Sequence, residues 1–136
     1  MTSFTSRYGN PADDYKGVHI RAYSRHTATV VTVTGRVDAR NVDHVIARST
    51  RLIHEDTPLV LDLTGVSAFT PAAMRLFIAV DDRCAAVAGQ WALVAGDALV
   101  RRIRGADLPI RATVAEAEHR FDDAIMRRRG LLGRTA

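Results

Sequence analysis

The stretch Leu59–Val80 places the strongest constraint on the fold, because it changes from a strand pattern to a helix pattern within a few residues. Residues 59–63, Leu-Val-Leu-Asp-Leu, are almost continuously apolar, which is typical of a strand covered on both faces. We expect a loop over residues 64–69. Thr70 and Pro71 then have the residue types of a helix N-cap and a first helical position. The sequence therefore predicts a helix that starts at the carboxyl end of a buried strand, where open α/β sheets usually carry their functional sites.

The helix that follows is expected over residues 71–88. Its apolar side chains recur at helical spacing, with Ile78 beside the buried stripe and Gly89 as the residue that ends the helix. The other predicted elements are a hairpin of two strands (18–23 and 27–34), a helix (41–54), a strand (91–95), a short helix (98–104), a last strand (109–112) and a C-terminal helix opened by a capping box at Thr113-x-x-Glu116. This order predicts the α/β class, with a mixed, mostly parallel sheet of about five strands, an N-terminal β-hairpin and about four helices.

Length and composition indicate one compact domain. The chain has 136 residues, of which 47% are hydrophobic. We expect a flexible leader over residues 1–16, the domain over residues 17–126 and a basic tail over residues 127–136. The single cysteine, Cys84, cannot form an internal disulfide, and neither a signal peptide nor a membrane-spanning run is present. These features predict a cytoplasmic protein with no membrane partner.

The charge pattern and the motifs argue against nucleic-acid binding and against catalysis. The formal net charge is +4 and arginines gather late in the chain, but aromatic residues are only 6% and no nucleic-acid-binding motif is present. The five histidines are scattered without the spacing of metal ligands. Phosphate-loop, nucleophile-elbow and dinucleotide motifs are also missing. The sequence therefore predicts a protein that is not an enzyme and that uses no metal and no cofactor.

Two segments of the chain resemble a known family. Residues 62–67, Asp-Leu-Thr-Gly-Val-Ser, match the first part of the strand–loop–helix motif of the STAS domain, the domain of bacterial anti-sigma factor antagonists. Residues 70–74, Thr-Pro-Ala-Ala-Met, stand where that family has Asp-Ser-Ser-Gly-Leu. Residues 35–38, Gly-Arg-Val-Asp, resemble the family's Gly-Glu-Leu-Asp segment. The resemblance covers about residues 17–126, and the expected order of strands and helices is complete.

The resemblance implies a switch based on protein contact. An unphosphorylated STAS domain binds an anti-sigma factor that is an ATP-dependent kinase, and phosphorylation of the second serine of the motif separates the two proteins. In this chain that phosphoacceptor position is Ala72, which has no hydroxyl, and the nearby Thr70 is the candidate substitute acceptor. The expected partner-binding residues are Thr34, Gly35, Arg36, Asp38, Thr70, Pro71, Ala72, Ala73 and Arg75.

Several alternatives stay open at the level of sequence. Asp38 either faces the partner or only turns the chain into the next helix, and both roles are compatible. The first functional reading is an antagonist that binds its anti-sigma factor without being switched off at residue 72. The second is a scaffold or sensor whose helix N-terminus holds a small anion or nucleotide. The sequence also leaves open the oligomeric state, including a homodimer.

Overall fold

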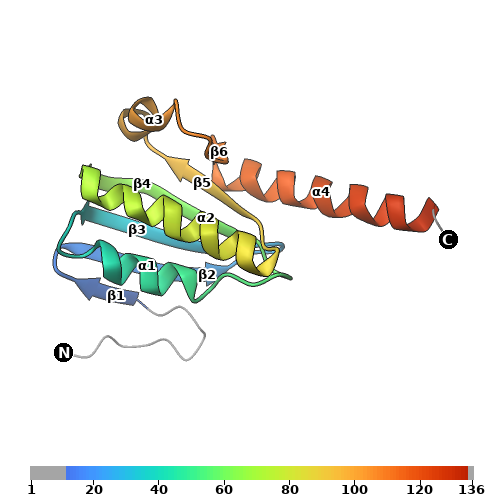
Figure 1. The fold of residues 1–136 in the computed structure, drawn as a ribbon, viewed down its shortest axis with the longest axis horizontal. Coiled ribbons are helices and arrows are strands. Elements are labelled where there is room, and N and C mark those ends of the chain that lie inside the picture. Colours follow the sequence, from blue (N-terminus) through green and yellow to red (C-terminus); the bar gives the residue numbers. More distant parts are fainter. Residues whose placement is uncertain (1–11, 135–136) are drawn as a thin grey trace.

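A six-stranded mixed sheet organises the chain, and its strands lie side by side in the order in which they occur in the sequence (Figure 1). The computed structural model describes residues 12–134. The strands are β1 (Ala12–Tyr15), β2 (Val18–Ser24), β3 (Thr29–Val37), β4 (Leu59–Phe69), β5 (Trp91–Ala95) and β6 (Ile110–Arg111). The helices are α1 (Val42–Thr50), the 3-10 helix η1 (Pro71–Met74), α2 (Arg75–Val87), α3 (Asp97–Ile103) and α4 (Val114–Arg134). The predicted α/β class is confirmed.

The N-terminal part of the sheet contains one more strand than we expected. The predicted hairpin is present as the antiparallel pair β2 and β3. β1 adds to its outer edge, because residues 12–15 pair antiparallel with residues 18–21. The expectation of a flexible leader is therefore wrong for residues 12–16, while residues 1–11 lie outside the described part of the chain. Tyr15 of β1 stacks on His44 of α1 at 4.2 Å between ring centroids, and Asp13 accepts a hydrogen bond from His44 at 2.5 Å. These contacts hold the strand in place.

β4 is longer than the apolar run predicted. Residues 64–69, expected as a loop, continue the strand and pair with the end of β3, with Thr34 opposite Gly65 and Val37 opposite Phe69. Two register shifts between the strands absorb the irregular spacing. The sequence pattern missed this extension because the exposed residues there are small or polar, whereas the strand is held by backbone pairing with β3.

Helices cover both faces of the sheet. α1 and α2 lie on one face (Figure 1), where the larger core includes Val31, Val33 and Leu61. α4 packs on the other face through Ala117 and Phe121, against a smaller core. Alternate residues of β3, β4 and β5 face the two cores, which explains why the central strand is apolar at nearly every position.

The helix after β4 begins with a 3-10 turn, η1, before α2 continues as an α-helix. The expected stripe consists of Phe77, Val80, Cys84 and Val87: the first three are buried, and Val87 is partly buried. Ile78 differs from the expectation, because its side chain is 63% exposed. Leu76 is buried in its place, so the buried face is rotated toward that residue.

α4 starts as predicted and extends further than predicted. The Thr113 hydroxyl accepts a hydrogen bond from the backbone N–H of Glu116 at 3.0 Å, as a capping box requires. Glu118 on the next turn accepts hydrogen bonds from the backbone N–H of Thr27 and from Arg25, which ties α4 to the turn between β2 and β3. These hydrogen bonds hold the pKa of the Glu118 carboxyl below its usual value. The helix continues to Arg134, so the expected basic tail of residues 127–136 is helical as far as the structure describes it.

The C-terminal end of α2 yields a test of the backbone geometry. The residue in the left-handed region is Ala88, with φ of 56°, and not Gly89 as expected. The Gly89 N–H donates to the Cys84 carbonyl at 2.8 Å. This bond spans six residues and is the 6→1 hydrogen bond of a Schellman motif. A Cβ atom is disfavoured in this region, so Ala88→Gly removes strain from the folded state, while the glycine also gives the unfolded chain more freedom. The difference between these two effects should raise the free energy of unfolding by about 0.5–1 kcal/mol. Thermal unfolding measures this as a rise of a few degrees in Tm.

Ala86→Gly is the matched control, because Ala86 lies within the right-handed part of α2. This variant should lower the free energy of unfolding by about 0.5–1 kcal/mol, and Tm should fall with it. Equal losses of stability in the two variants would contradict a left-handed Ala88.

Candidate partner-docking face

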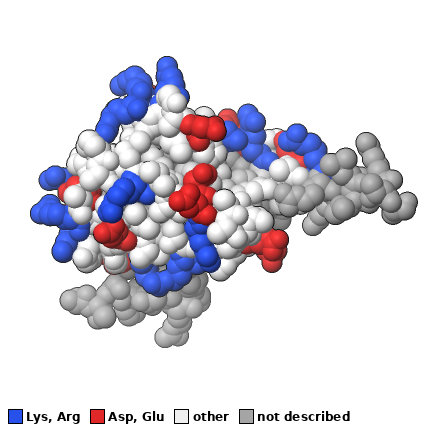
Figure 2. Space-filling view, viewed as in Figure 1, with Lys and Arg blue, Asp and Glu red and all other residues white. Residues whose placement is uncertain are grey.

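The two segments expected to form a docking face do meet in the structure. Parallel pairing brings the end of β3 beside the end of β4, and the Thr70 N–H donates to the Val37 carbonyl at 3.1 Å. Residues 34–38 and 70–75 therefore form adjacent parts of one end of the molecule, where the parallel strands finish. We call this surface, residues 34–38 and 70–75, the docking face. Figure 2 shows basic side chains at this end of the molecule, where α2 begins in Figure 1.

Thr70 does not cap the helix as predicted. Its side chain makes no hydrogen bond to a helix N–H and instead points toward the Val37 carbonyl, 3.5 Å away. The first turn is a 3-10 turn in which the Ala73 N–H donates to the Thr70 carbonyl at 2.9 Å. The backbone carbonyl of Thr70, and not its hydroxyl, therefore satisfies the first available helical donor.

The exposed part of the helix start is smaller than predicted. Pro71 and Ala72 are exposed, but Ala73 is completely buried in the core beneath them. Pro71 has no N–H, and the Ala73 N–H is already bonded to Thr70. Among these first residues only Ala72 has a backbone donor left for a ligand, so the helix start is poorly suited to hold an anion.

Asp38 has a structural role at the end of β3. Its carboxylate accepts a hydrogen bond from the Arg40 N–H at 2.9 Å, and its carbonyl accepts one from the Val42 N–H at the start of α1. The guanidinium groups of Arg36 and Arg40 lie 3.7 Å and 3.6 Å from the same carboxylate. The carboxylate is almost buried, so the turn-forming role of Asp38 is observed directly, and the surface next to it is presented by the two arginines.

Asn41 is a structural residue that the sequence analysis did not single out. Its side chain is fully buried, and its amide donates to the carbonyls of Lys16 and Arg36 while its oxygen accepts from the Asp38 N–H. One side chain thus joins the β1–β2 turn to the end of β3. An asparagine three residues after an aspartate at a strand end was the available signal, because both residue types form local turns.

The start of α2 carries a second arginine contact and an apolar groove. Arg75 donates to Asp43 of α1 at 2.5 Å, and both side chains are more than half exposed.

Further along α2, the exposed Ile78 lies in a groove of about 330 Å³ together with Met74 and Leu108. Asp81 and Asp82 also line this groove. We call it the Ile78 groove.

Within residues 12–134, no group of three or more histidine, cysteine or acidic side chains could hold a metal ion. No helix of this described part is long and apolar enough to cross a membrane.

Burial raises the pKa of the Cys84 thiol to about 11, and Asp81 adds to this shift. The thiol is therefore protonated at neutral pH and has the character of a core residue.

Gly35 is required by close backbone contact, which yields a prediction for stability. It has φ of 94°, and a Cβ atom there would lie 2.4 Å from the Gly17 carbonyl oxygen. Gly35→Ala should therefore lower the free energy of unfolding by more than the strain of the positive φ alone, which is about 1–2 kcal/mol. Urea denaturation measures the loss.

Gly17→Ala supplies the matched control. Gly17 has nearly the same φ, 91°, but nothing lies within 4 Å of its Cβ position. We expect Gly35→Ala to be the more destabilising of the two by about 1–3 kcal/mol, the usual cost of overpacking. Equal losses would show that contact with Gly17 does not constrain residue 35.

Known proteins resemble this chain in sequence and in fold. The chain is 41% identical over 138 residues to osmosensory protein A of Mycobacterium tuberculosis, an alignment that covers 96% of this chain and 87% of the relative. An anti-sigma factor antagonist from Mycobacterium paratuberculosis superposes with a TM-score of 0.57 at 22% identity, over 74% of this chain and 90% of that one. The antagonist SpoIIAA in its unphosphorylated form gives a TM-score of 0.57 at 18% identity, over 82% and 96% of the two chains. These two structures share the fold of this chain.

The family model for the STAS domain matches residues 19–117, which include the hairpin, the central strand, η1 with α2, and the first turn of α4. The match confirms the family resemblance found in the sequence. The chain belongs to the STAS domain family.

Proposed function

We propose that this chain is a cytoplasmic anti-sigma factor antagonist that binds an anti-sigma factor of the kinase type through the docking face. The observation that carries the proposal is the exposed helix start of a STAS domain in which the expected phosphoacceptor is Ala72. Binding of the anti-sigma factor would free the sigma factor and so regulate transcription.

The chemistry of residue 72 argues for binding that is not switched off there. A phosphate on a serine at this place would add about −1.5 to −2 charges to a surface that the partner must approach. Ala72 removes the acceptor. The half-buried Thr70 hydroxyl lies against the Val37 carbonyl, so it is a poor substitute acceptor. Regulation would then come from the amount of the protein or from another part of the chain.

The Ile78 groove provides the apolar contact that a stable complex needs. Fully burying an isoleucine side chain contributes about 1.5–3 kcal/mol, and Ile78 is now 63% exposed. The groove lies on the same helix as the docking face and continues it along α2. Exposed Arg36 and Arg75 at the other end of the face favour acidic groups on the partner.

The anion-sensor alternative receives less support. Pro71 has no N–H, and the Ala73 N–H is bonded to Thr70, so the helix start offers few free donors.

The 41% identity to osmosensory protein A supports a more specific form of the antagonist role. We propose that the chain acts in the transcriptional response to a change in osmolarity.

Ala72→Glu tests the docking face. It adds a fixed negative charge at an exposed position, where helix-dipole attraction should preserve the fold. We expect affinity for the anti-sigma factor, identified by pull-down from the native cells and measured by calorimetry, to fall by about tenfold or more. Tm should change little. In cells, the variant should also weaken the transcriptional response to an osmotic upshift.

Ala115→Glu is the matched control, because Ala115 is exposed in the first turn of α4, and α4 packs on the opposite face of the sheet from α2. This variant should bind the anti-sigma factor as the parent chain does. If Ala72→Glu bound equally tightly, the docking face would not be the interface and the proposal would fail.

The absence of the phosphoacceptor gives a second test. After incubation with the anti-sigma factor and ATP, mass spectrometry should find Thr70 and residue 72 unmodified in the parent chain. Ala72→Ser restores the hydroxyl at the family position and should become phosphorylated, which shows that the kinase is active. Stoichiometric phosphate on Thr70 of the parent chain would contradict the proposal that the protein is not switched off at this site.

A further inference from the structure

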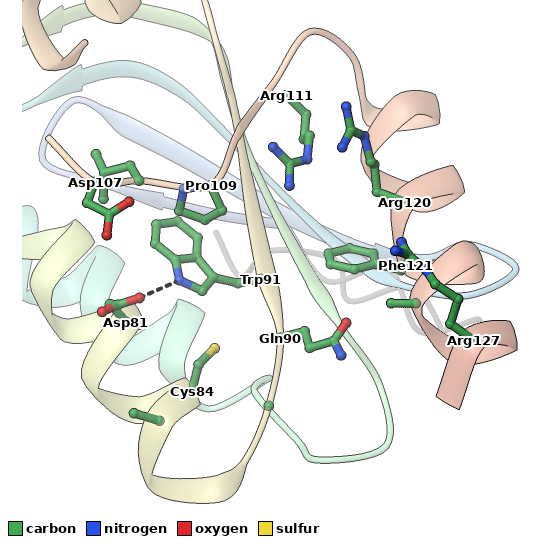
Figure 3. Close-up of a pocket in the computed structure, with 14 residues that line it drawn as sticks. Asp81, Cys84, Gln90, Trp91, Asp107, Pro109, Arg111, Arg120, Phe121 and Arg127 are labelled. Carbon is green, nitrogen blue, oxygen red and sulfur yellow. Dashed lines mark hydrogen bonds between the residues drawn. The ribbon is translucent and has the colours of Figure 1, made fainter. Parts of the chain in front are cut away.

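A second groove lies away from the docking face, between the C-terminal half of α2, the edge strand β6 and α4. It has a volume of about 730 Å³. Figure 3 shows Trp91 in its centre, with α2 on one side and α4 on the other. Arg111, Arg120 and Arg127 also line it. We call it the arginine groove.

The fold directs these three arginines to one side of the groove. Arg111 pairs with Val94, which belongs to the core under α4, so the Arg111 side chain leaves the sheet on the α4 face. Arg120, Ala124 and Arg127 follow one another at helical spacing of four and three residues, and all three line the groove. The result is a basic stripe along α4 with a small residue at its middle.

The stripe is not neutralised within the described chain. None of Arg111, Arg120 and Arg127 forms a salt bridge with an acidic side chain that the structure describes. Two acids of α4 near the stripe pair with other residues: Glu118 with Arg25 at 3.0 Å, and Asp123 with His119 at 3.5 Å. The positive charge of the stripe is therefore available to an outside anionic group.

The opposite side of the groove is acidic. Asp81 accepts a hydrogen bond from the Trp91 indole N–H at 3.0 Å, and Asp107 lies near it (Figure 3). Trp91 and Phe121 between the two sides are only 7% and 6% exposed. Their rings are part of the core and present little face for stacking.

We propose that the arginine groove is a docking site for an acidic segment of a protein, bound along α4 with carboxylates facing Arg120 and Arg127. Seven residues of α-helix separate these arginines by about 10 Å along the axis. That spacing suits two carboxylates that lie seven positions, or two turns, apart on a partner helix, and Ala124 allows the partner backbone to approach closely. A single phosphate could face both only if the side chains folded back along the helix.

The same features disfavour a nucleic acid. A phosphate backbone lying in the groove would pass close to Asp81 and Asp107, which repel it. Bases would also find no exposed aromatic face, because Trp91 and Phe121 are buried. A protein segment can instead place acidic groups toward α4 and basic or neutral groups toward α2.

Trp91 is the single tryptophan of the chain and lines the groove, so its fluorescence reports binding at this place. The probe is a synthetic helical peptide without tryptophan, with two glutamates seven positions apart and a leucine between them. We expect it to change the Trp91 emission saturably, with an affinity that falls as salt is added. In the double variant Arg120→Gln/Arg127→Gln the affinity should fall by about tenfold or more.

Two controls separate this site from general attraction to a basic protein. The double variant Arg51→Gln/Arg101→Gln also removes two positive charges, but from exposed residues at the C-terminal end of α1 and on α3. It should bind the peptide as the parent chain does. A peptide with glutamine at both glutamate positions should not bind. Equal loss of affinity in both double variants would overturn the proposal.

Other occupants give distinct results that also overturn it. Inorganic phosphate or a single-stranded DNA oligonucleotide that changes Trp91 emission at lower concentration than the peptide would assign the groove to that ligand. Self-association in ultracentrifugation that Arg120→Gln/Arg127→Gln abolishes would assign it to a second copy of the chain. No emission change with the peptide up to millimolar concentration would exclude the site. Loss of binding to the docking face through Ala72→Glu has no bearing on this outcome.

Discussion

Parallel pairing between β3 and β4 is the interaction on which the arrangement of the candidate site depends. The two strands stay paired beyond two register shifts, until Val37 lies opposite Phe69. This pairing places the end of β3 beside the start of η1, although the two segments are more than thirty residues apart in the sequence. The buried amide of Asn41 then fixes the end of β3 with three hydrogen bonds. Loss of that side chain would leave the buried N–H of Asp38 without its partner, at a cost of about 1–3 kcal/mol, and would also remove the bonds to the Lys16 and Arg36 carbonyls.

Local sequence was sufficient wherever one physical signal dominated. The apolar run at 59–63 predicted a strand buried on both faces, and the capping box at Thr113 predicted the start of α4. β1 gave no such signal, because Asp13 and Asp14 are poor strand residues. Its position depends on tertiary contacts with α1, namely the stacking of Tyr15 and the bonding of Asp13. Contacts of that kind cannot be read from a local pattern.

The candidate site was predicted less well than the fold, above all at the helix start. We expected an α-helix from Pro71 with the Thr70 hydroxyl as its cap, and both Ala72 and Ala73 among the partner-binding residues. The first turn is instead a 3-10 turn, in which the Thr70 carbonyl accepts a hydrogen bond from the Ala73 N–H. Ala73 lies four residues before Phe77 and seven before Val80, so it belongs to the buried face of the helix. Ile78 is exposed because it lies about 200° around α2 from the buried Leu76 and Val80. The residue types at this helix start were consistent with either geometry.

The two proposed surfaces have opposite chemistry, although they share one residue. Asp81 lines both the Ile78 groove and the arginine groove, and its bond to the Trp91 indole holds it between them. The Ile78 groove is apolar with Asp81 and Asp82 beside it, so it favours an apolar residue flanked by basic groups. The stripe of Arg120 and Arg127 favours acidic groups. A partner segment suited to one groove therefore meets like charge at the other. The two grooves therefore select segments of different charge.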